Sequence, residues 1–402
     1  MTLASALRTP LDPEPRDFSI ILGGPLFQLL RRAHISGDAL ELVRRRVVVM
    51  ALLAWLPLLV LCIASGDAFG GAAAVPFVKD VQVHVRFLIA MPLLIVAELV
   101  VHQRLRPVAF EFLTRGLVPS DAVGRFQEKL AAAMRLRNSV SAEVLMIVVV
   151  YAFGVPVVWR QIGAIDVATW YAASTDGRVQ LTLPGIWYAY VSVPLFQFLM
   201  LRWYFRLIVW MRFLWSVSRI RLDLHAMHAD RMAGLGFLST TVFAFVPLAM
   251  AHGALLSGTI ANRIFYAGQT LMDARFEIAI VVVFLLILVL GPLTVFAPQV
   301  AHAKHGSARI FGRLSQRYVQ EFEATWLPGG APATSSPLGT SDIQSLADLG
   351  NSFETIHATR FAPITRDAVL GLAIATLAPV APLLFTVIPA EEIAKHLVTL
   401  IL

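Results

Sequence analysis

Two His-x-x-His pairs and a nearby aspartate are the residues in this chain whose types and spacing could bind a metal. On a helix, each pair would place both imidazoles on one face. Neutral imidazoles with a carboxylate suit a divalent metal that activates water. One hypothesis is therefore a metal site drawn from His225, His228, Asp230, His302 and His305.

The stretch that contains the first pair, LDLHAMHADRMAGLGF at Leu222–Phe237, has a second interpretation. Neither pair has the general-base glutamate of an H-E-x-x-H helix, and no further ligand set follows at a fixed spacing. Asp230 and Arg231 would then form an ion pair in a polar loop that leads into a membrane. The sequence leaves both interpretations open.

Ionisable residues inside apolar runs give a different hypothesis. Charges at membrane depth are costly unless they are paired or hydrated, so they are typical of transport pathways. The candidate residues for such a pathway are Glu98, His102, Arg202, Arg206, Asp230 and Arg231. Alternatively, Arg202 and Arg206 reach the lipid headgroups by snorkelling, and Glu98 makes a structural pair between two helices.

These residues must be positioned by membrane-spanning helices, because the composition is that of a membrane protein. The chain is 57% hydrophobic and only 15% charged, with a mean hydropathy of +0.72. A soluble domain has about 25% charged residues. We expect an all-α, polytopic transmembrane helix bundle of about seven spans. The spans are predicted at Val47–Ala64, Phe87–Val101, Val144–Trp159, Ile186–Leu201, Leu235–Ser257, Ile278–Pro298 and Ala368–Ile388.

The basic residues predict the orientation of the bundle. Most of the 33 Lys and Arg residues fall in alternate connections, on the side that holds the amino terminus. The positive-inside rule then predicts a cytoplasmic N-terminus and an external C-terminus. The net charge of +7 indicates attraction to anionic lipids at the cytoplasmic face, and no separable basic domain points to nucleic acid.

The chain divides into four predicted regions. Residues 1–46 are a cytoplasmic segment with a short interfacial helix around Phe18–Leu30, for which a re-entrant segment is the alternative. Residues 47–300 hold spans 1 to 6, with a small external β-hairpin at Asp176-Gly177. Residues 301–366 form cytoplasmic helices around a Pro, Gly and Ser-rich linker at 328–340. Residues 367–402 are span 7 and an external amphipathic tail.

The sequence favours transport over catalysis without deciding between them. It has no phosphate-binding loop, no G-x-S-x-G elbow and no dinucleotide fingerprint. Cys62 is the single cysteine, so disulfides are excluded. We expect a channel or transporter for a small ion or solute, with a polar vestibule facing the cytoplasm and no cofactor.

Two alternatives remain open at this point. One is a membrane-embedded hydrolase that uses a divalent metal at the cytoplasmic face. The other is an accessory membrane protein that binds a partner through a helix at Ser341–Arg360, whose Ile343, Leu346 and Leu349 begin an apolar stripe. A homo-oligomer is compatible with each of these functions.

The segment HADRMAGLGF, together with SDIQSLADL further on, resembles segments of uncharacterised bacterial multi-pass inner-membrane proteins. The pattern it resembles is H-P-D-R-x-G-G-L-G-F, from which Ala229 and Ala233 depart. The resemblance implies a multi-pass protein of the bacterial inner membrane, and it implies no activity.

Overall fold

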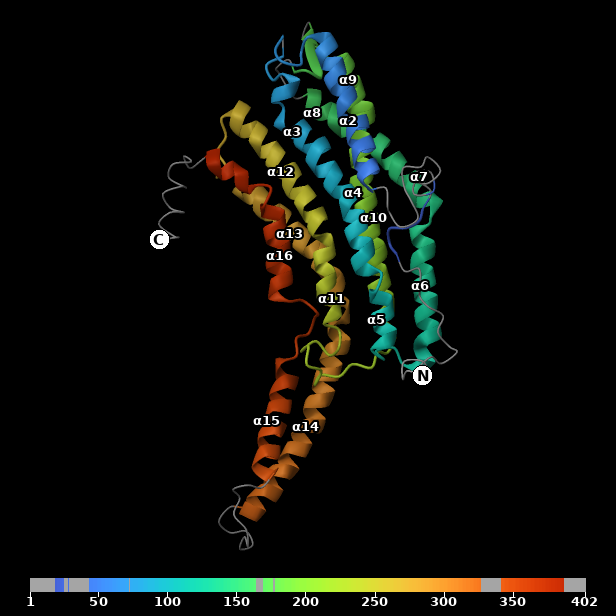
Figure 1. The fold of residues 1–402 in the computed structure, drawn as a ribbon, viewed down its shortest axis with the longest axis vertical. Coiled ribbons are helices and arrows are strands. Elements are labelled where there is room, and N and C mark those ends of the chain that lie inside the picture. Colours follow the sequence, from blue (N-terminus) through green and yellow to red (C-terminus); the bar gives the residue numbers. More distant parts are fainter. Residues whose placement is uncertain are drawn as a thin grey trace, which may run out of the picture.

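The computed structural model describes residues 19–24, 28, 43–71, 73–163, 169–175, 178–326 and 341–386. The chain is an all-α polytopic helix bundle with one small two-stranded sheet (Figure 1), which confirms the predicted fold class. Six described helical segments are long and apolar enough to cross a membrane. We call them spans 1 to 6: Val43–Ser65, Val81–Thr114, Val140–Arg160, Leu183–Val217, Phe237–Ala267 and Arg275–Trp326.

Spans 2 to 6 each consist of several helical elements in series. Span 1 is the single helix α2 (Val43–Ser65). Span 2 contains α3 (Val81–His84), η3 (Val85–Ala90), α4 (Met91–Leu105) and α5 (Val108–Thr114). Span 3 lies within α7 (Val140–Val149), η5 (Val150–Gly154) and α8 (Val155–Gly163). Span 4 contains α9 (Leu183–Trp187), η6 (Tyr188–Ser192) and α10 (Val193–Val217). Span 5 contains α11 (Phe237–Thr240), η7 (Thr241–Phe245) and α12 (Val246–Ala267), and span 6 contains α13 (Arg275–Leu290), η8 (Gly291–Phe296) and α14 (Ala297–Trp326).

Three of these elements, η3, η5 and η6, are π-helical, and each ends two residues before a proline. The prolines are Pro92, Pro156 and Pro194. A proline has no N–H to donate, and its ring collides with the carbonyl four residues earlier, so the preceding turn widens. For Pro194, the carbonyl four residues earlier is that of Tyr190. It accepts a hydrogen bond of 3.2 Å from the Tyr151 hydroxyl on span 3 in place of the missing N–H. The disturbance of each of these helices by its proline therefore takes the form of local widening.

The predicted seventh span is only partly a regular helix. It consists of α16 (Arg366–Leu377) and the 3-10 segment η9 (Ala381–Thr386), and residues 387–388 lie outside the described part. This region is not among the six segments that are long enough to span. α16 nevertheless packs against α12 and α13 and runs along the bundle beside them (Figure 1).

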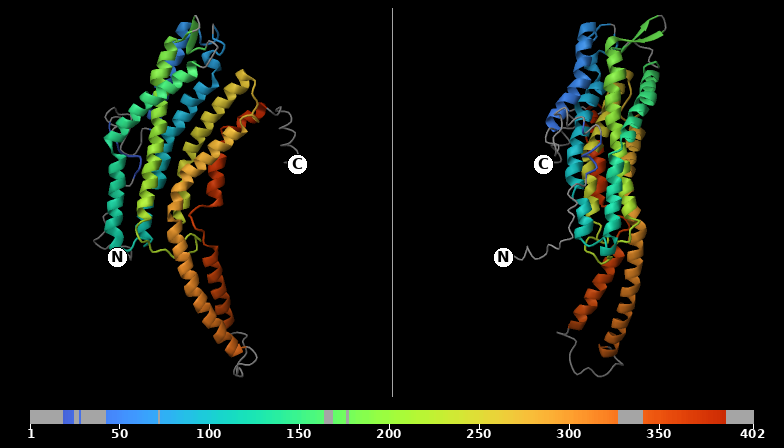
Figure 2. Two further views of the ribbon diagram at one scale, coloured as in Figure 1. Left: turned by 180° about the vertical axis from the view of Figure 1, so that it is seen from behind. Right: turned by 90° about the vertical axis from the view of Figure 1, so that its right-hand side faces the viewer.

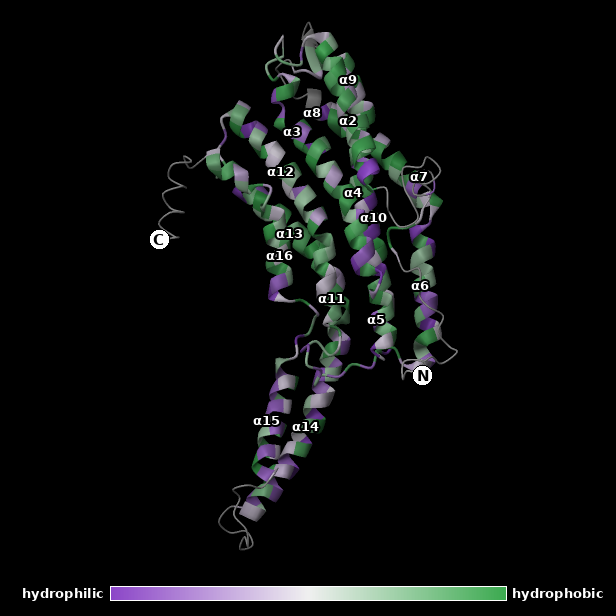
Figure 3. Ribbon diagram, viewed as in Figure 1, coloured by the Kyte–Doolittle hydropathy of each residue, from purple (hydrophilic) through white to green (hydrophobic). Residues whose placement is uncertain are grey.

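A helical hairpin projects from one end of the bundle. It is formed by α14 and α15 (Ser341–Ala358), which pack side by side and extend beyond the other helices (Figures 1 and 2). Figure 3 shows that this hairpin is mainly hydrophilic, whereas the bundle is mainly hydrophobic. The predicted linker at 328–340 lies outside the described residues.

The opposite end of the bundle carries the predicted β-hairpin (Figure 2). β1 (Ala172–Thr175) pairs antiparallel with β2 (Arg178–Leu181), and the pairing of Thr175 with Arg178 leaves two residues for the turn. The predicted turn residues 176 and 177 lie outside the described part of the chain. The hairpin itself is confirmed.

The described part of the amino-terminal segment differs from the predicted interfacial helix. Residues 19–24 are not helical, and Ser19, Ile20 and Ile21 are only 3%, 1% and 1% exposed. Gly23 and Gly24 have φ values of +148° and +88°, which a regular helix does not allow. The described segment is packed into the bundle. Most of Phe18–Leu30 beyond it lies outside the described residues.

Candidate functional site

Glu98 is the centre of a buried charge cluster that joins three spans. It lies on α4 and is 2% exposed. Nη1 of Arg206, on α10, donates to Oε1 of Glu98 at 2.7 Å, and Nη2 of Arg46, on α2, donates to Oε2. Both carboxylate oxygens therefore bind a guanidinium. This arrangement meets the need of a buried carboxylate for charged hydrogen-bond donors.

The phase of α10 places its two arginines inside the protein. Arg202 and Arg206 are one turn apart, on the face that also buries Leu199, Trp203 and Trp210. Both arginines are 4% exposed, and the Arg206 guanidinium lies 5.0 Å from the centre of the Trp203 ring. The snorkelling alternative is therefore wrong for both side chains. They face the core instead of the surrounding solvent or lipid.

Arg202 makes the longest polar contacts in the cluster. Its Nη1 lies 3.7 Å from Oε1 of Glu98, and its Nη2 lies 3.5 Å from Oε1 of Glu143 on α7. Nη2 also donates to the carbonyl of Gly23 at 3.4 Å. Glu98 is already bound by Arg46 and Arg206, so it offers Arg202 only a distant contact.

The cluster contains more cations than anions among the described residues. Arg46, Arg202 and Arg206 face two carboxylates, those of Glu98 and Glu143, and all five side chains are buried. In addition, Nε of Arg46 is buried and has no hydrogen-bond partner among the described residues. The cluster thus combines an excess positive charge with an unused donor, which are the properties of an anion site.

The segment 19–24 covers this cluster. The Ser19 hydroxyl shares a 2.8 Å hydrogen bond with Nδ1 of His102, and the Gly24 N–H donates to Oδ1 of Asn138 at 3.1 Å. A Cβ on Gly24 would lie 2.7 Å from Oε1 of Glu143, so only glycine fits there without a shift. His102, one of the predicted pathway residues, is 7% exposed and touches the cluster region through this segment.

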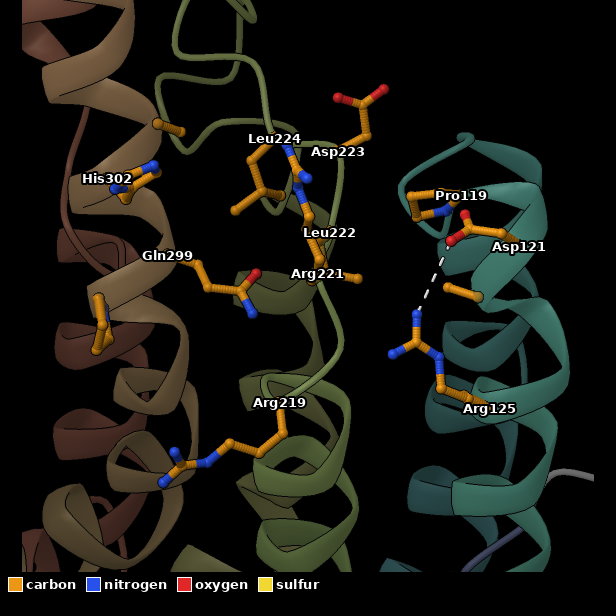
Figure 4. Close-up of a pocket in the computed structure, with 13 residues that line it drawn as sticks. Pro119, Asp121, Arg125, Arg219, Arg221, Leu222, Asp223, Leu224, Gln299 and His302 are labelled. Carbon is orange, nitrogen blue, oxygen red and sulfur yellow. Dashed lines mark ion pairs between the residues drawn. The ribbon is translucent and has the colours of Figure 1, made fainter.

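A second polar site is a cavity of about 830 Å³ near the base of the α14–α15 hairpin (Figure 4). Its walls come from the connection before α6 (Val123–Arg137), the residues after α10 and the start of α14. Its charged and titratable side chains are Asp121, Arg125, Arg219, Arg221, Asp223 and His302. Arg125 and Asp121 form a loose ion pair at 3.9 Å. Cations outnumber carboxylates, so the cavity favours anions.

Asp230 has a structural role that the sequence did not reveal. Its carboxylate accepts backbone hydrogen bonds from Met232 at 2.8 Å, Gly234 at 3.2 Å and Gly236 at 2.7 Å. Burial alone would raise the pKa of Asp230, but these three donors outweigh burial and hold the pKa below its usual value. Asp230 therefore organises the loop that leads into span 5.

The loop around Asp230 also explains the small residues of the HADRMAGLGF segment. Gly234 has φ +94°, and a Cβ on Gly236 would lie 2.8 Å from Oδ2 of Asp230. Ala233, which departs from the resembled pattern, has φ +57°, a conformation that glycine adopts more readily. Among the described contacts, neither Asp230 nor Arg231 touches the Glu98 cluster, and the two do not form the ion pair of the alternative interpretation.

The five predicted metal ligands do not meet at one point. Nδ1 of His228 contacts Oδ1 of Asp230 at 3.0 Å, whereas Nε2 of His225 contacts Oδ1 of Asp223 at 3.5 Å. His302 lines the polar cavity, and His305 follows one turn later on α14. In the described part of the chain, no three His, Cys, Asp or Glu side chains are grouped so that they could hold a metal ion. The geometry does not assemble the predicted set.

Sequence reasoning missed Arg46 and the segment 19–24 as parts of the site. Arg46 belongs to a run of three arginines that indicates only a cytoplasmic helix end. Its helical phase could have indicated that Arg46 is buried. Arg46 lies four residues before Met50 and eight before Ala54, and all three are on the buried face of α2. Ser19 and Gly23 gave no such signal.

Comparison with protein families, curated proteins and solved structures finds no match to this chain.

Proposed function

We propose that this chain is a transporter or channel of the bacterial inner membrane that moves a small anion, with Arg202 as the principal binding group. The observation that carries the proposal is the buried excess of guanidinium groups, in which the polar contacts of Arg202 with described residues are 3.4–3.7 Å long. An arginine at membrane depth costs about 2.5–3.5 kcal/mol on insertion scales. A purely structural ion-pair network has no need of such an unbalanced charge.

The other polar features are consistent with an entry route for anions. The cavity near α14 carries Arg125, Arg219 and Arg221, which would raise the local anion concentration at the face predicted to be cytoplasmic. The segment 19–24 would control access to the cluster, because the Gly23 carbonyl accepts a hydrogen bond from Nη2 of the Arg202 guanidinium. An anion that replaces this carbonyl would gain a charge-assisted hydrogen bond.

The experiment is flux in proteoliposomes, with chloride, inorganic phosphate and a small carboxylate as separate probes. We expect the wild type to move at least one of them faster than empty liposomes do. Arg202→Gln should lose this flux, whereas Arg212→Gln should retain it, because Arg212 lies on the same helix but is exposed. Wild-type flux equal to that of empty liposomes for all three probes would overturn the proposal.

A further inference from the structure

Two adjoining cavities lie in the half of the bundle that carries the β-hairpin. The first has a volume of about 530 Å³ and the second about 380 Å³. Phe196, Gln197 and Leu255 line both of them, so the cavities meet at these three residues. Together they form a groove along spans 3, 4 and 5.

The first cavity contains a cation that has no acidic partner among the described residues. Arg86, on η3, donates to the Tyr188 hydroxyl at 2.5 Å, and no carboxylate of the described residues lies within 4.0 Å of it. Tyr171, Gln82 and Thr259 add further polar groups to this wall. A half-buried guanidinium with polar neighbours in a partly open cavity is suited to a phosphate or a carboxylate.

The second cavity is mainly apolar. Val149, Val150, Phe153, Met200 and Leu201 form much of its wall. Among the described residues that line it, the ionisable side chains are Tyr204 and His252, which share a hydrogen bond of 2.9 Å. An acyl chain fits these surroundings, whereas a small hydrated ion does not.

The groove opens toward the lipid side of span 3. Phe153 is 68% exposed and Val157 is 48% exposed, and each lines one of the two cavities. Exposed apolar residues on a membrane span face acyl chains. A ligand could therefore enter sideways from the bilayer.

The widened π-helical turns shape this groove. Arg86 belongs to η3, Tyr188 to η6 and Phe153 to η5. Gly154, which ends η5, allows the close approach of Gln197, because a Cβ there would lie 2.3 Å from Oε1 of Gln197. This Oε1 is buried and has no hydrogen-bond partner among the described atoms.

From these observations we infer that the groove binds one anionic phospholipid, with its phosphate at Arg86 and one acyl chain in the apolar cavity. The site lies away from the face where the net charge predicts attraction to anionic lipids. It is also separate from the Glu98 cluster, since the residues that line the two cavities are not members of that cluster.

Native mass spectrometry of the detergent-purified protein tests this inference. The probes are phosphatidylglycerol and phosphatidylcholine with the same acyl chains. We expect one phosphatidylglycerol to be retained in preference to phosphatidylcholine. Arg86→Gln should lower its occupancy about tenfold, as for the loss of one charged hydrogen bond, and Arg86→Lys should keep most of it.

Three controls make the outcome decisive. Arg160→Gln removes an exposed arginine from the same end of the bundle and should bind lipid as the wild type does. Gly154→Leu should weaken binding by filling the narrow part of the groove, and size-exclusion profiles identify variants that fail to fold. Equal binding of both lipids, or no effect of Arg86→Gln, would show ordinary annular lipid and overturn the inference. Arg86-dependent stabilisation by inorganic phosphate without lipid retention would also overturn it, in favour of a free-anion site.

Discussion

Arg206 and Glu98 form an ion pair at 2.7 Å between α10 and α4, although both side chains are almost completely buried, at 4% and 2% exposed. Such a pair holds two spans together only while both charges are present. Removing one partner leaves the other charge buried without compensation, which costs more than the intact pair contributes.

Replacing the carboxylate of Glu98 should therefore destabilise the protein strongly. In Glu98→Gln, three buried guanidinium groups would face one described carboxylate, and we expect a loss of about 3–5 kcal/mol in the free energy of unfolding. Denaturant unfolding of the detergent-solubilised protein measures this loss. Glu128→Gln, an exposed carboxylate on α6, should change stability by less than about 0.5 kcal/mol. Similar stabilities for the two variants would contradict the role of Glu98.

The amino-terminal segment should move when Gly24 carries a side chain. Gly24→Ala combines a φ of +88° with a Cβ placed 2.7 Å from Oε1 of Glu143. We expect the segment 19–24 to leave its place and the amide hydrogens of residues 19–24 to exchange faster with deuterium. Gly116→Ala serves as the control, because Gly116 also has positive φ but nothing lies within 4 Å of its added Cβ. Unchanged exchange in Gly24→Ala would show that the segment does not depend on this close fit.

Asp230 should make the stability of the protein depend on pH. Its pKa is lower in the folded state than the ordinary value of about 3.9, so its contribution is complete above that value. The contribution is lost as the pH falls through the folded-state pKa. We expect Asp230→Asn to cost about 1–3 kcal/mol at neutral pH and progressively less in acid.

The matched control for Asp230 is Asp223→Asn, since Asp223 is exposed in the same loop. It should leave stability nearly unchanged at every pH. A difference between the wild type and Asp230→Asn that stays constant from pH 6 to pH 3 would argue against the pKa effect.

Metal content provides an independent check on the histidine pairs. No group of three suitable ligands occurs in the described part of the chain, so changing His225 and His228 to alanine should not alter the metal content of protein purified without chelators. Elemental mass spectrometry makes this comparison. A near-stoichiometric divalent metal that disappears in the double variant would restore the hydrolase alternative.

Composition and helical phase predicted much of the fold, because apolar length alone determines where a helix can span a bilayer. They also located Glu98, Arg202 and Arg206, since charges inside apolar runs are conspicuous. The helical phase of Arg46 matches that of Met50 and Ala54, but its place in a run of three arginines at a helix end favours a surface charge. The inward orientation of Arg46 depends on Glu98, which lies on another helix, α4.

Contacts between distant segments set the remaining features. Residues 19–24 are held by Arg137, Asn138 and His102, which lie more than 80 positions away in the chain, so no local pattern predicts them. The π-helical turns follow from prolines, but the sequence predicts only that each proline disturbs its helix. The sequence leaves Asp230 open to a metal site, a transport pathway or a loop ion pair, because its backbone partners depend on the folded loop.

The most direct test of the anion-site proposal is the initial rate of anion flux as a function of anion concentration in wild type, Arg202→Lys and Arg202→Gln at equal reconstitution. We predict saturable flux in the wild type, partial flux in Arg202→Lys and loss of at least tenfold in Arg202→Gln, with Arg212→Gln unchanged. Saturable flux that is the same in folded Arg202→Gln as in the wild type would contradict the assignment of the anion site to Arg202.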